Sequence, residues 1–233
     1  MQSIVQEAYH SFGHLFFPHY CMGCKLNLKQ REQLLCYDCA QLLPATHFFQ
    51  YPDNPVERSF YGRINIAHGA AAFYFTKNSL LHDLLIEMKY LHNKHAGRFL
   101  GRLMGNQLIL SKRFNTIDAL IPLPLHPKKQ SIRGYNQAEL ICEGIHEVCK
   151  IPIINNAVQR TSFSETQTHR NRISRWQNMD GIFQLSNPAI IQHKHLLLID
   201  DVTTTGATLE ACGKAILMAN AVSLSIATLA YTP

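Results

Sequence analysis

The sequence lacks the features that would mark a membrane or secreted protein. No apolar run among its 233 residues approaches the roughly 18 residues needed to cross a bilayer. Residues 1–18 mix polar and apolar side chains, so we expect no secretory signal and predict a cytoplasmic protein. Internal repeats and low-complexity tracts are absent, and a hydrophobic content of 46% excludes wholesale disorder.

Two common nucleotide-binding signatures are missing as well. The chain contains no G-x-G-x-x-G, which disfavours dinucleotide binding. It also contains no glycine-rich loop ending in lysine and serine or threonine, which disfavours nucleoside triphosphate hydrolysis. The net charge of +6 favours anionic partners such as phosphates or nucleic acid, although solubility alone also tolerates this charge.

Cysteines are concentrated near the N-terminus in two Cys-x-x-Cys pairs, formed by Cys21, Cys24, Cys36 and Cys39. The two-residue spacer lets a tight turn direct both sulfurs of a pair toward one point, and a closed set of four thiolates suits a structural Zn²⁺. Two disulfides are the alternative, but they need an oxidising compartment, and the remaining cysteines are unpaired and scattered. A redox Cys-x-x-Cys is a lesser alternative. We therefore predict a zinc-binding module within residues 1–43.

The rest of the chain is predicted to be a linker, residues 44–65, followed by an α/β domain, residues 66–233. Apolar runs alternate there with helical patterns of about 10–15 residues, which indicates a mostly parallel sheet. The expected strands are Ala70–Phe75, Ala119–Leu123, Ile151–Ile154, Gly181–Leu185, His195–Asp200 and Val222–Tyr231. The expected helices are Leu80–Leu91, Ala96–Leu110, Asn136–Lys150 and Ala207–Asn220. Residues 3–17 are equally compatible with an amphipathic helix and a frayed terminus.

One expected strand ends in two acids, Asp200 and Asp201, and then enters a helix through a turn of threonines and a glycine. Such a turn presents backbone N–H groups, and the helix dipole adds roughly half a positive charge, so it suits a phosphate. Carboxylates repel phosphate, and ribose hydroxyls or a hard cation such as Mg²⁺ suit them better. A helix-capping Asp and Thr is the purely structural alternative. The pattern predicts a site for a ribose 5-phosphate.

This stretch resembles the phosphoribosyl-diphosphate motif of type I phosphoribosyltransferases. The resemblance implies that the 5-phosphate is held by Thr204, Thr205, Gly206, Ala207 and Thr208. It also implies that Asp200 and Asp201 bind the ribose 2- and 3-hydroxyls. The implied fold is a type I phosphoribosyltransferase-like parallel sheet flanked by helices, with the small zinc module in front of it.

A second candidate segment follows the expected strand at 119–123. Its alternating prolines make a rigid exit toward Lys128, Lys129 and Arg133, which is a reasonable cradle for diphosphate. A basic surface loop is the alternative. Together with the four cysteines, the Pro-x-Pro exit and the sequence from Arg133 to Gln137 resemble the ComF/GntX family. That resemblance makes Lys89 a candidate second contact to the substrate.

The arginine-rich residues 160–175 also resemble a segment of that family. They are expected to close as a cationic lid over diphosphate, with Arg175 as one contact. A solvated loop is the alternative reading of this stretch.

The combined resemblance implies binding of 5-phosphoribosyl 1-diphosphate with Mg²⁺ and transfer of the phosphoribosyl group to a nitrogen acceptor. Asp200, Asp201 and Arg133 would then be the catalytic residues. The alternative is a non-catalytic protein that handles single-stranded DNA with the competence machinery during natural transformation, which is the role associated with ComF-type proteins. The sequence does not identify the acceptor.

Overall fold

The computed structural model describes residues 19–28, 33–161, 182–220 and 222–233. A parallel four-stranded sheet forms its centre, in the order β1-β6-β5-β2. The strands are β1 (Gly69–Tyr74), β6 (Ser223–Tyr231), β5 (His195–Thr203) and β2 (Ala119–Pro122). The register of the central pair runs from His195 opposite Ser223 to Thr203 opposite Tyr231. Leu196–Ile199 is fully buried, which explains its uninterrupted apolar sequence.

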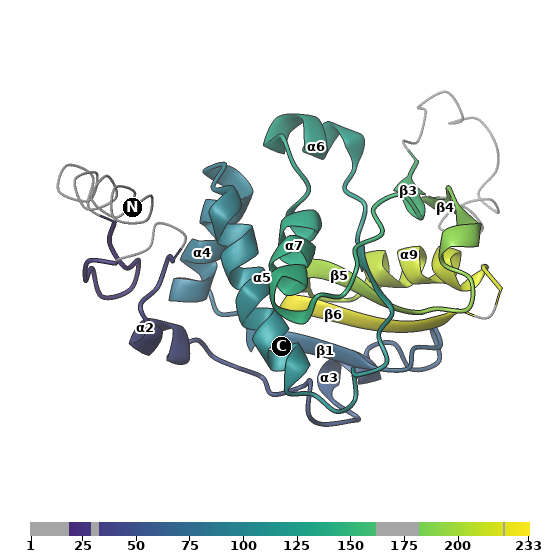
Figure 1. Ribbon diagram of the computed structural model, residues 1–233, viewed down its shortest axis with the longest axis horizontal. Coiled ribbons are helices and arrows are strands. Elements are labelled where there is room, and N and C mark those ends of the chain that lie inside the picture. The colour runs from purple at the N-terminus through teal and green to yellow at the C-terminus, as the bar shows by residue number, and fades with distance from the viewer. Residues whose placement is uncertain (1–18, 29–32, 162–181, 221) are drawn as a thin grey trace, which may run out of the picture.

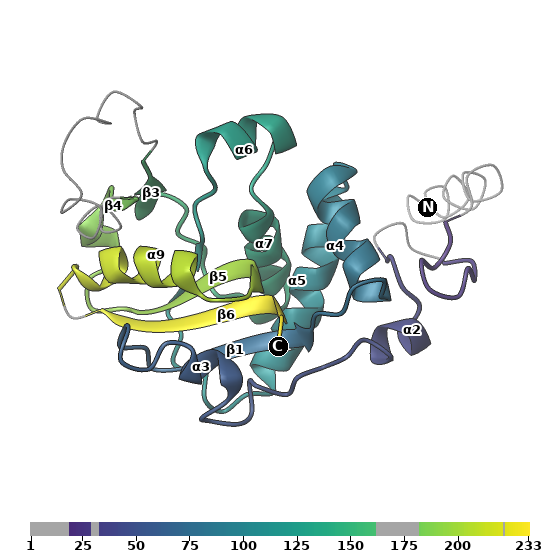
Figure 2. The same cartoon turned by 180° about the vertical axis from the view of Figure 1, so that it is seen from behind.

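Helices flank this sheet, and α4 to α7 and α9 lie in the connections between its strands (Figures 1 and 2). They are α2 (Tyr37–Gln41), α3 (Pro55–Arg58), α4 (Leu80–Tyr90), α5 (Lys94–Ile109), α6 (Pro127–Arg133), α7 (Gln137–Cys149) and α9 (Ala207–Leu217). In both views the cysteine-containing segment lies at one end of the long axis, near α4. A short antiparallel pair lies at the other end, formed by β3 (Val158–Arg160) and β4 (Phe183–Leu185). The predicted fold class, a parallel sheet flanked by helices, is confirmed.

Two of the expected strands differ from the structure. The prediction of a strand at Ile151–Ile154 is wrong, because only Ile153 forms an isolated bridge, to Leu120. Pro152 has no N–H group, so it cannot donate to a ladder with the short strand β2. The expected strand at 181–185 is observed as β4, but it pairs with β3 and does not join the central sheet.

The predicted linker, residues 44–65, contributes to the core of the α/β domain. It contains the short helix α3, whose first turn is capped by the Asn54 side chain. Its buried apolar side chains are Phe48, Phe49, Val56 and Phe60. The segment therefore packs against the domain that follows it, and our domain boundaries stay a prediction.

Two close contacts, one between helices and one between a turn and a helix, position the rest of the fold. Helices α5 and α7 approach so closely that a Cβ on Gly144 would lie 2.1 Å from the carbonyl oxygen of Arg98. At the other contact, Gly23 packs against α4, since a Cβ there would lie 3.3 Å from Leu80 Cδ2. Within the described residues, no helix combines the length and the apolarity needed to cross a membrane.

Candidate functional site

The carboxyl end of β5 forms a pocket with the turn that leads into α9. The pocket is lined by Asp200 and residues 202–209. Gly206 is the N-cap of α9 and brings no side-chain capping bond. Ala207 N–H reaches only Thr205 Oγ1, at a long 3.4 Å. The turn therefore leaves N–H groups at a helix N-terminus that are available to an anion, and binding of the 5-phosphate there stays a prediction.

Two further observations single out this turn. Thr203 lines the pocket, is 3% exposed, and its Oγ1 atom has no hydrogen-bond partner among the described residues. An unpaired buried hydroxyl costs free energy unless a ligand or water completes it. Gly206 has a φ of 70°, and a Cβ at this position would lie 2.9 Å from the ring of the fully buried Phe60. Both the backbone conformation and the space require glycine here.

The two acids lie on opposite sides of the sheet edge, because successive side chains of a strand alternate. Asp200 interacts electrostatically with Arg160 of β3, and its charge is also felt by Cys212 of α9. Asp201 faces α4, where its Oδ2 lies 2.8 Å from Lys89 Nζ. The structure thus brings Lys89 to one of the two predicted carboxylates. Arg160, expected in the lid, acts electrostatically on the other carboxylate, Asp200, together with Lys89.

Removal from water determines the protonation of Asp200. Burial, and then the charge of Asp201, raise the pKa of Asp200 to about 8, while the Asp201 N–H, Lys89 and Arg160 act in the opposite direction. The Asp201 N–H donates to Asp200 Oδ1 at 2.8 Å. Near neutral pH the pair therefore carries fewer than two negative charges, and one carboxyl can donate as well as accept a hydrogen bond.

The predicted diphosphate cradle contacts the end of α4 through Arg133. Arg133, in the last turn of α6, donates to Gln137 Oε1 at 2.8 Å, and its Cζ lies 5.6 Å from the ring centre of Tyr90. Arg133 therefore contacts the C-terminal end of α4, the helix that also carries Lys89. Among the described residues Arg133 forms no ion pair with either carboxylate. Arg175 and nearly all of the expected lid lie outside the described residues.

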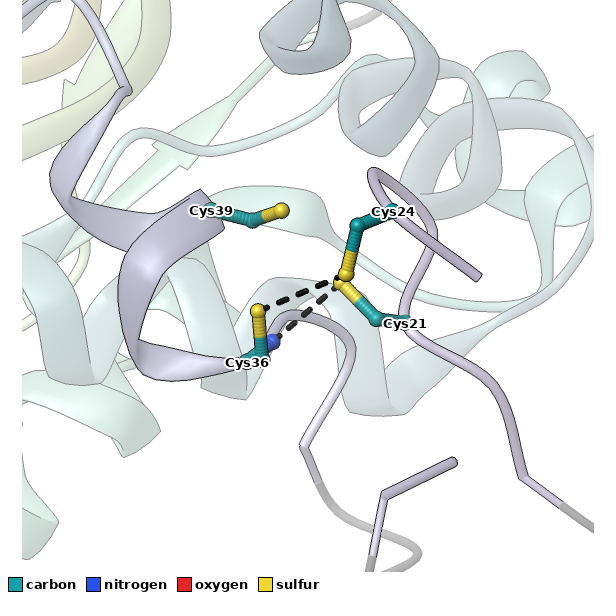
Figure 3. A group of neighbouring side chains, drawn as sticks. All are labelled: Cys21, Cys24, Cys36 and Cys39. Carbon is teal, nitrogen blue, oxygen red and sulfur yellow. Dashed lines mark hydrogen bonds between the residues drawn. The ribbon is translucent and has the colours of Figure 1, made fainter. Parts of the chain in front are cut away.

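The four cysteines gather at one point (Figure 3). Their sulfur atoms all lie within 4.8 Å of one another, and none forms a disulfide. Cys24 Sγ lies 3.6 Å from Cys36 Sγ. Four Zn–S bonds of about 2.3 Å in a tetrahedron place sulfurs about 3.8 Å apart, so the cluster has the dimensions of a structural zinc site.

The protonation of these thiols also fits a cation. Burial raises the pKa of Cys21, but backbone N–H groups, chiefly that of Cys36, outweigh it and lower the pKa to about 6. Burial and the neighbouring sulfurs raise the pKa of Cys39 to about 12. Thiols this close do not all ionise unless a bound cation neutralises them. The residues therefore fit Zn²⁺.

Two residues of the site could not be found from the sequence. Phe60, beneath Gly206, and Arg63, which donates to the Thr205 carbonyl oxygen at 2.9 Å, both come from the predicted linker. Arg63 and Thr205 are 142 residues apart, so no local pattern connects them. The sequence shows only an aromatic residue, Phe60, and a nearby cation, Arg63, in a loop-rich stretch, and such a combination is common on protein surfaces.

Comparison with known proteins found relatives along most of the chain. Competence protein F of Haemophilus influenzae is 28% identical over 216 residues, which is 85% of this chain and 91% of the relative. DNA utilization protein YhgH of Salmonella typhimurium is 25% identical, over 91% of this chain and 90% of its own. Competence protein ComFC of Bacillus subtilis is 33% identical over 100 residues, 42% of this chain and 38% of its own.

Two other comparisons add little. No protein-family profile matches the chain. Among solved structures, the glutamine phosphoribosylpyrophosphate amidotransferase of B. subtilis complexed with ADP and GMP has a TM-score of 0.42 at 15% identity. The aligned region covers 60% of this chain and 30% of the amidotransferase, and the TM-score is too low to support an assignment. The predicted resemblance is nevertheless confirmed by the relatives, because the chain is similar over most of its length to competence protein F and to DNA utilization protein YhgH, and over 42% of its length to ComFC.

Proposed function

We propose that the protein binds 5-phosphoribosyl 1-diphosphate together with Mg²⁺ and transfers the phosphoribosyl group to a nitrogen acceptor. The observation that carries the proposal is the open turn of residues 204–208, which shares a pocket with Asp200 at the carboxyl end of β5. Asp201 is the next residue of the same strand. A phosphate site next to acceptors for a diol matches the two halves of a ribose 5-phosphate. The motif resemblance supports the same ligand.

Each group has a defined part in this chemistry. The N–H groups of the turn hold the 5-phosphate, and Asp200 and Asp201 accept hydrogen bonds from the ribose hydroxyls. When diphosphate leaves C1, the ribose ring gains positive charge, which the carboxylates stabilise, while Lys89 and Arg133 stabilise the departing anion. Lys89 must exchange its contact with Asp201 for the ligand.

The residues present also fit Mg²⁺. Burial, and then the charge of Asp201, raise the pKa of Asp200, and a divalent cation relieves the repulsion between the two carboxylates. Bound with diphosphate, Mg²⁺ would neutralise the charge of the leaving group.

Calorimetric titration with 5-phosphoribosyl 1-diphosphate, with and without Mg²⁺, tests this function. Two charge-assisted hydrogen bonds are worth roughly 3–6 kcal/mol together, so the double variant Asp200→Asn with Asp201→Asn should bind roughly 10²–10⁴-fold more weakly. Asp118→Asn is the matched control, because Asp118 lies at the opposite end of the same sheet and accepts a backbone bond from His195. A wild-type protein that does not bind this ligand would refute the proposal.

A second candidate function, binding of single-stranded DNA, is favoured by the surface around the ends of α4 and α6. Residues 89–98 and 124–135 each contain three lysines or arginines and no acid. They adjoin through the Arg133–Tyr90 contact and through a 3.1 Å bond between His92 Nδ1 and the Arg133 carbonyl oxygen. Tyr90 is 64% exposed, so its ring is accessible for stacking. Cations around an accessible ring suit unpaired bases. The name of one relative, DNA utilization protein YhgH, supports DNA as a partner.

Fluorescence anisotropy with a labelled oligonucleotide separates the two functions. Loss of base stacking in Tyr90→Ala should weaken DNA binding by about 1–3 kcal/mol. Tyr61→Ala is the control, since Tyr61 is 59% exposed and its hydroxyl bonds to Asp53. Carboxylates repel a phosphate backbone, so the Asp200/Asp201 double variant should bind DNA at least as tightly as the wild type. Equal loss of DNA binding in both tyrosine variants would contradict this surface.

A further inference from the structure

Arg63 connects the predicted linker to the phosphate-binding turn. Its Nη1 donates to the carbonyl oxygens of Ser59, at 2.7 Å, and of Thr205, at 2.9 Å. Its Nε donates to Glu210 Oε2 at 2.9 Å, and its Cζ lies 5.9 Å from the ring centre of Phe60. One side chain thus bonds to α3, to the turn and to α9 together. About a third of it is exposed (34%).

The direction of the Thr205 carbonyl has a consequence for the next N–H group. The described backbone contains no cis peptide bond. In a planar trans peptide the C=O and N–H bonds point in opposite directions. A Thr205 carbonyl held by Arg63 therefore fixes the Gly206 N–H on the side away from Arg63. Gly206 lines the pocket, so this N–H is one of the groups available to a phosphate.

The same contacts control a negative charge near the site. Glu210 lies in the first turn of α9, where an ionised carboxylate opposes the binding of phosphate. Its Oε1 lies 2.9 Å from Lys214 Nζ, and Oε2 is bonded to Arg63. The hydrogen bond from Lys214, and with it that from Arg63, lowers the pKa of Glu210 against the effect of burial. Glu210 is therefore ionised and neutralised by two cations.

We propose that Arg63 is a positioning residue for the phosphate site, which orients the turn of residues 204–208 and neutralises Glu210 so that the turn accepts an anion. The inference rests on the proposed function, because the ligand phosphate is that of the sugar. It assigns a role in binding to a segment that the sequence marked only as a linker.

The test compares Arg63→Gln, which keeps a donor but loses the charge and the fork, with Arg63→Lys, which keeps the charge. Arg58→Gln is the matched control, because Arg58 lies in the same segment and pairs with Asp53 at 2.6 Å on the surface. Calorimetry measures ribose 5-phosphate and 5-phosphoribosyl 1-diphosphate. NMR follows the Gly206 amide during titration with inorganic phosphate, at a temperature far below every unfolding midpoint.

Arg63→Gln should weaken both sugar phosphates by roughly 10–100-fold, as expected for one charge-assisted network, and should abolish the response of the Gly206 amide to phosphate. Arg63→Lys should recover part of the affinity, and Arg58→Gln should match the wild type. Wild-type affinity and an unchanged Gly206 response in Arg63→Gln would overturn the inference. The inference would also be overturned if Arg63→Gln lowered the unfolding midpoint but its folded molecules bound both sugar phosphates with wild-type affinity.

The outcomes also separate this inference from the proposed function. A wild-type protein whose Gly206 amide responds to phosphate through Arg63, but which does not bind 5-phosphoribosyl 1-diphosphate, would refute the proposed function and support the positioning role. A wild-type Gly206 amide that ignores phosphate would overturn the positioning role.

Discussion

Replacement of Gly206 by alanine tests the geometry of the phosphate turn most directly. The substitution forces a Cβ into a backbone with a φ of 70°, which costs about 1–2 kcal/mol for a residue other than glycine. The same Cβ would lie 2.9 Å from two atoms of the Phe60 ring, and forced overpacking of this kind costs about 1–3 kcal/mol. We therefore expect Gly206→Ala to lower the free energy of unfolding by roughly 2–5 kcal/mol.

The two contributions are separable with a second variant. Phe60→Leu removes the ring edge and leaves the backbone strain, so Gly206→Ala should cost about 1–3 kcal/mol less in that background than in the wild type. Urea unfolding followed by circular dichroism at 25 °C measures all four proteins of the cycle. Equal costs in both backgrounds would show that Phe60 does not restrict this position, and a cost below about 0.5 kcal/mol would refute the whole argument.

Three further predictions follow from other parts of the structure. Gly144→Ala should separate α5 from α7 and lower the unfolding midpoint markedly, because the added Cβ would meet the Arg98 carbonyl oxygen. A separate variant, Gly62→Ala, measures the cost of a positive φ alone, because no atom lies within 4 Å of the Cβ added there. Folding raises the pKa of Asp200 from 3.8 to about 8, so the carboxylate form becomes dominant only above that value. The contribution of Asp200 to the free energy of unfolding is fully present below pH 3.8 and is lost as pH rises through 8. Affinity for the sugar diphosphate should rise as pH rises through 8, because the carboxylate form then becomes dominant. A flat affinity from pH 6 to 9 would contradict this. The purified protein should contain about one zinc per chain by atomic emission, and Cys24→Ser or a chelator should lower its unfolding midpoint; two disulfides and no metal would exclude the site.

The parts of the site that follow one another along the chain could be predicted from the sequence. The residues from Asp200 to Thr208 form one continuous strand, turn and helix, so their order alone fixes their arrangement. The cysteine cluster follows from two short spacers for the same reason. Arg63 and Phe60 could not be predicted, because their contacts depend on the folding of a loop-rich segment against a turn far along the chain.

The strand errors have a similar origin. Apolar content around Pro152 indicated burial correctly, since Ile153 does bridge to Leu120, but a missing N–H group prevented a ladder. Residues 183–185 do form a strand, as their composition indicated, but composition does not tell which strand they pair with. Tertiary pairing decided that this strand lies against β3 and outside the central sheet.

Helix α4 connects the part of the molecule that holds the four cysteines with the carboxyl end of β5. Leu80, at the start of the helix, packs against Gly23 between the first two cysteines. Lys89, near its other end, is paired with Asp201. Eleven helical residues span about 16 Å, and a helix of this length does not bend appreciably. A shift of the cysteine loop at Gly23 would therefore move α4 as a unit, and with it the position of Lys89 relative to Asp201.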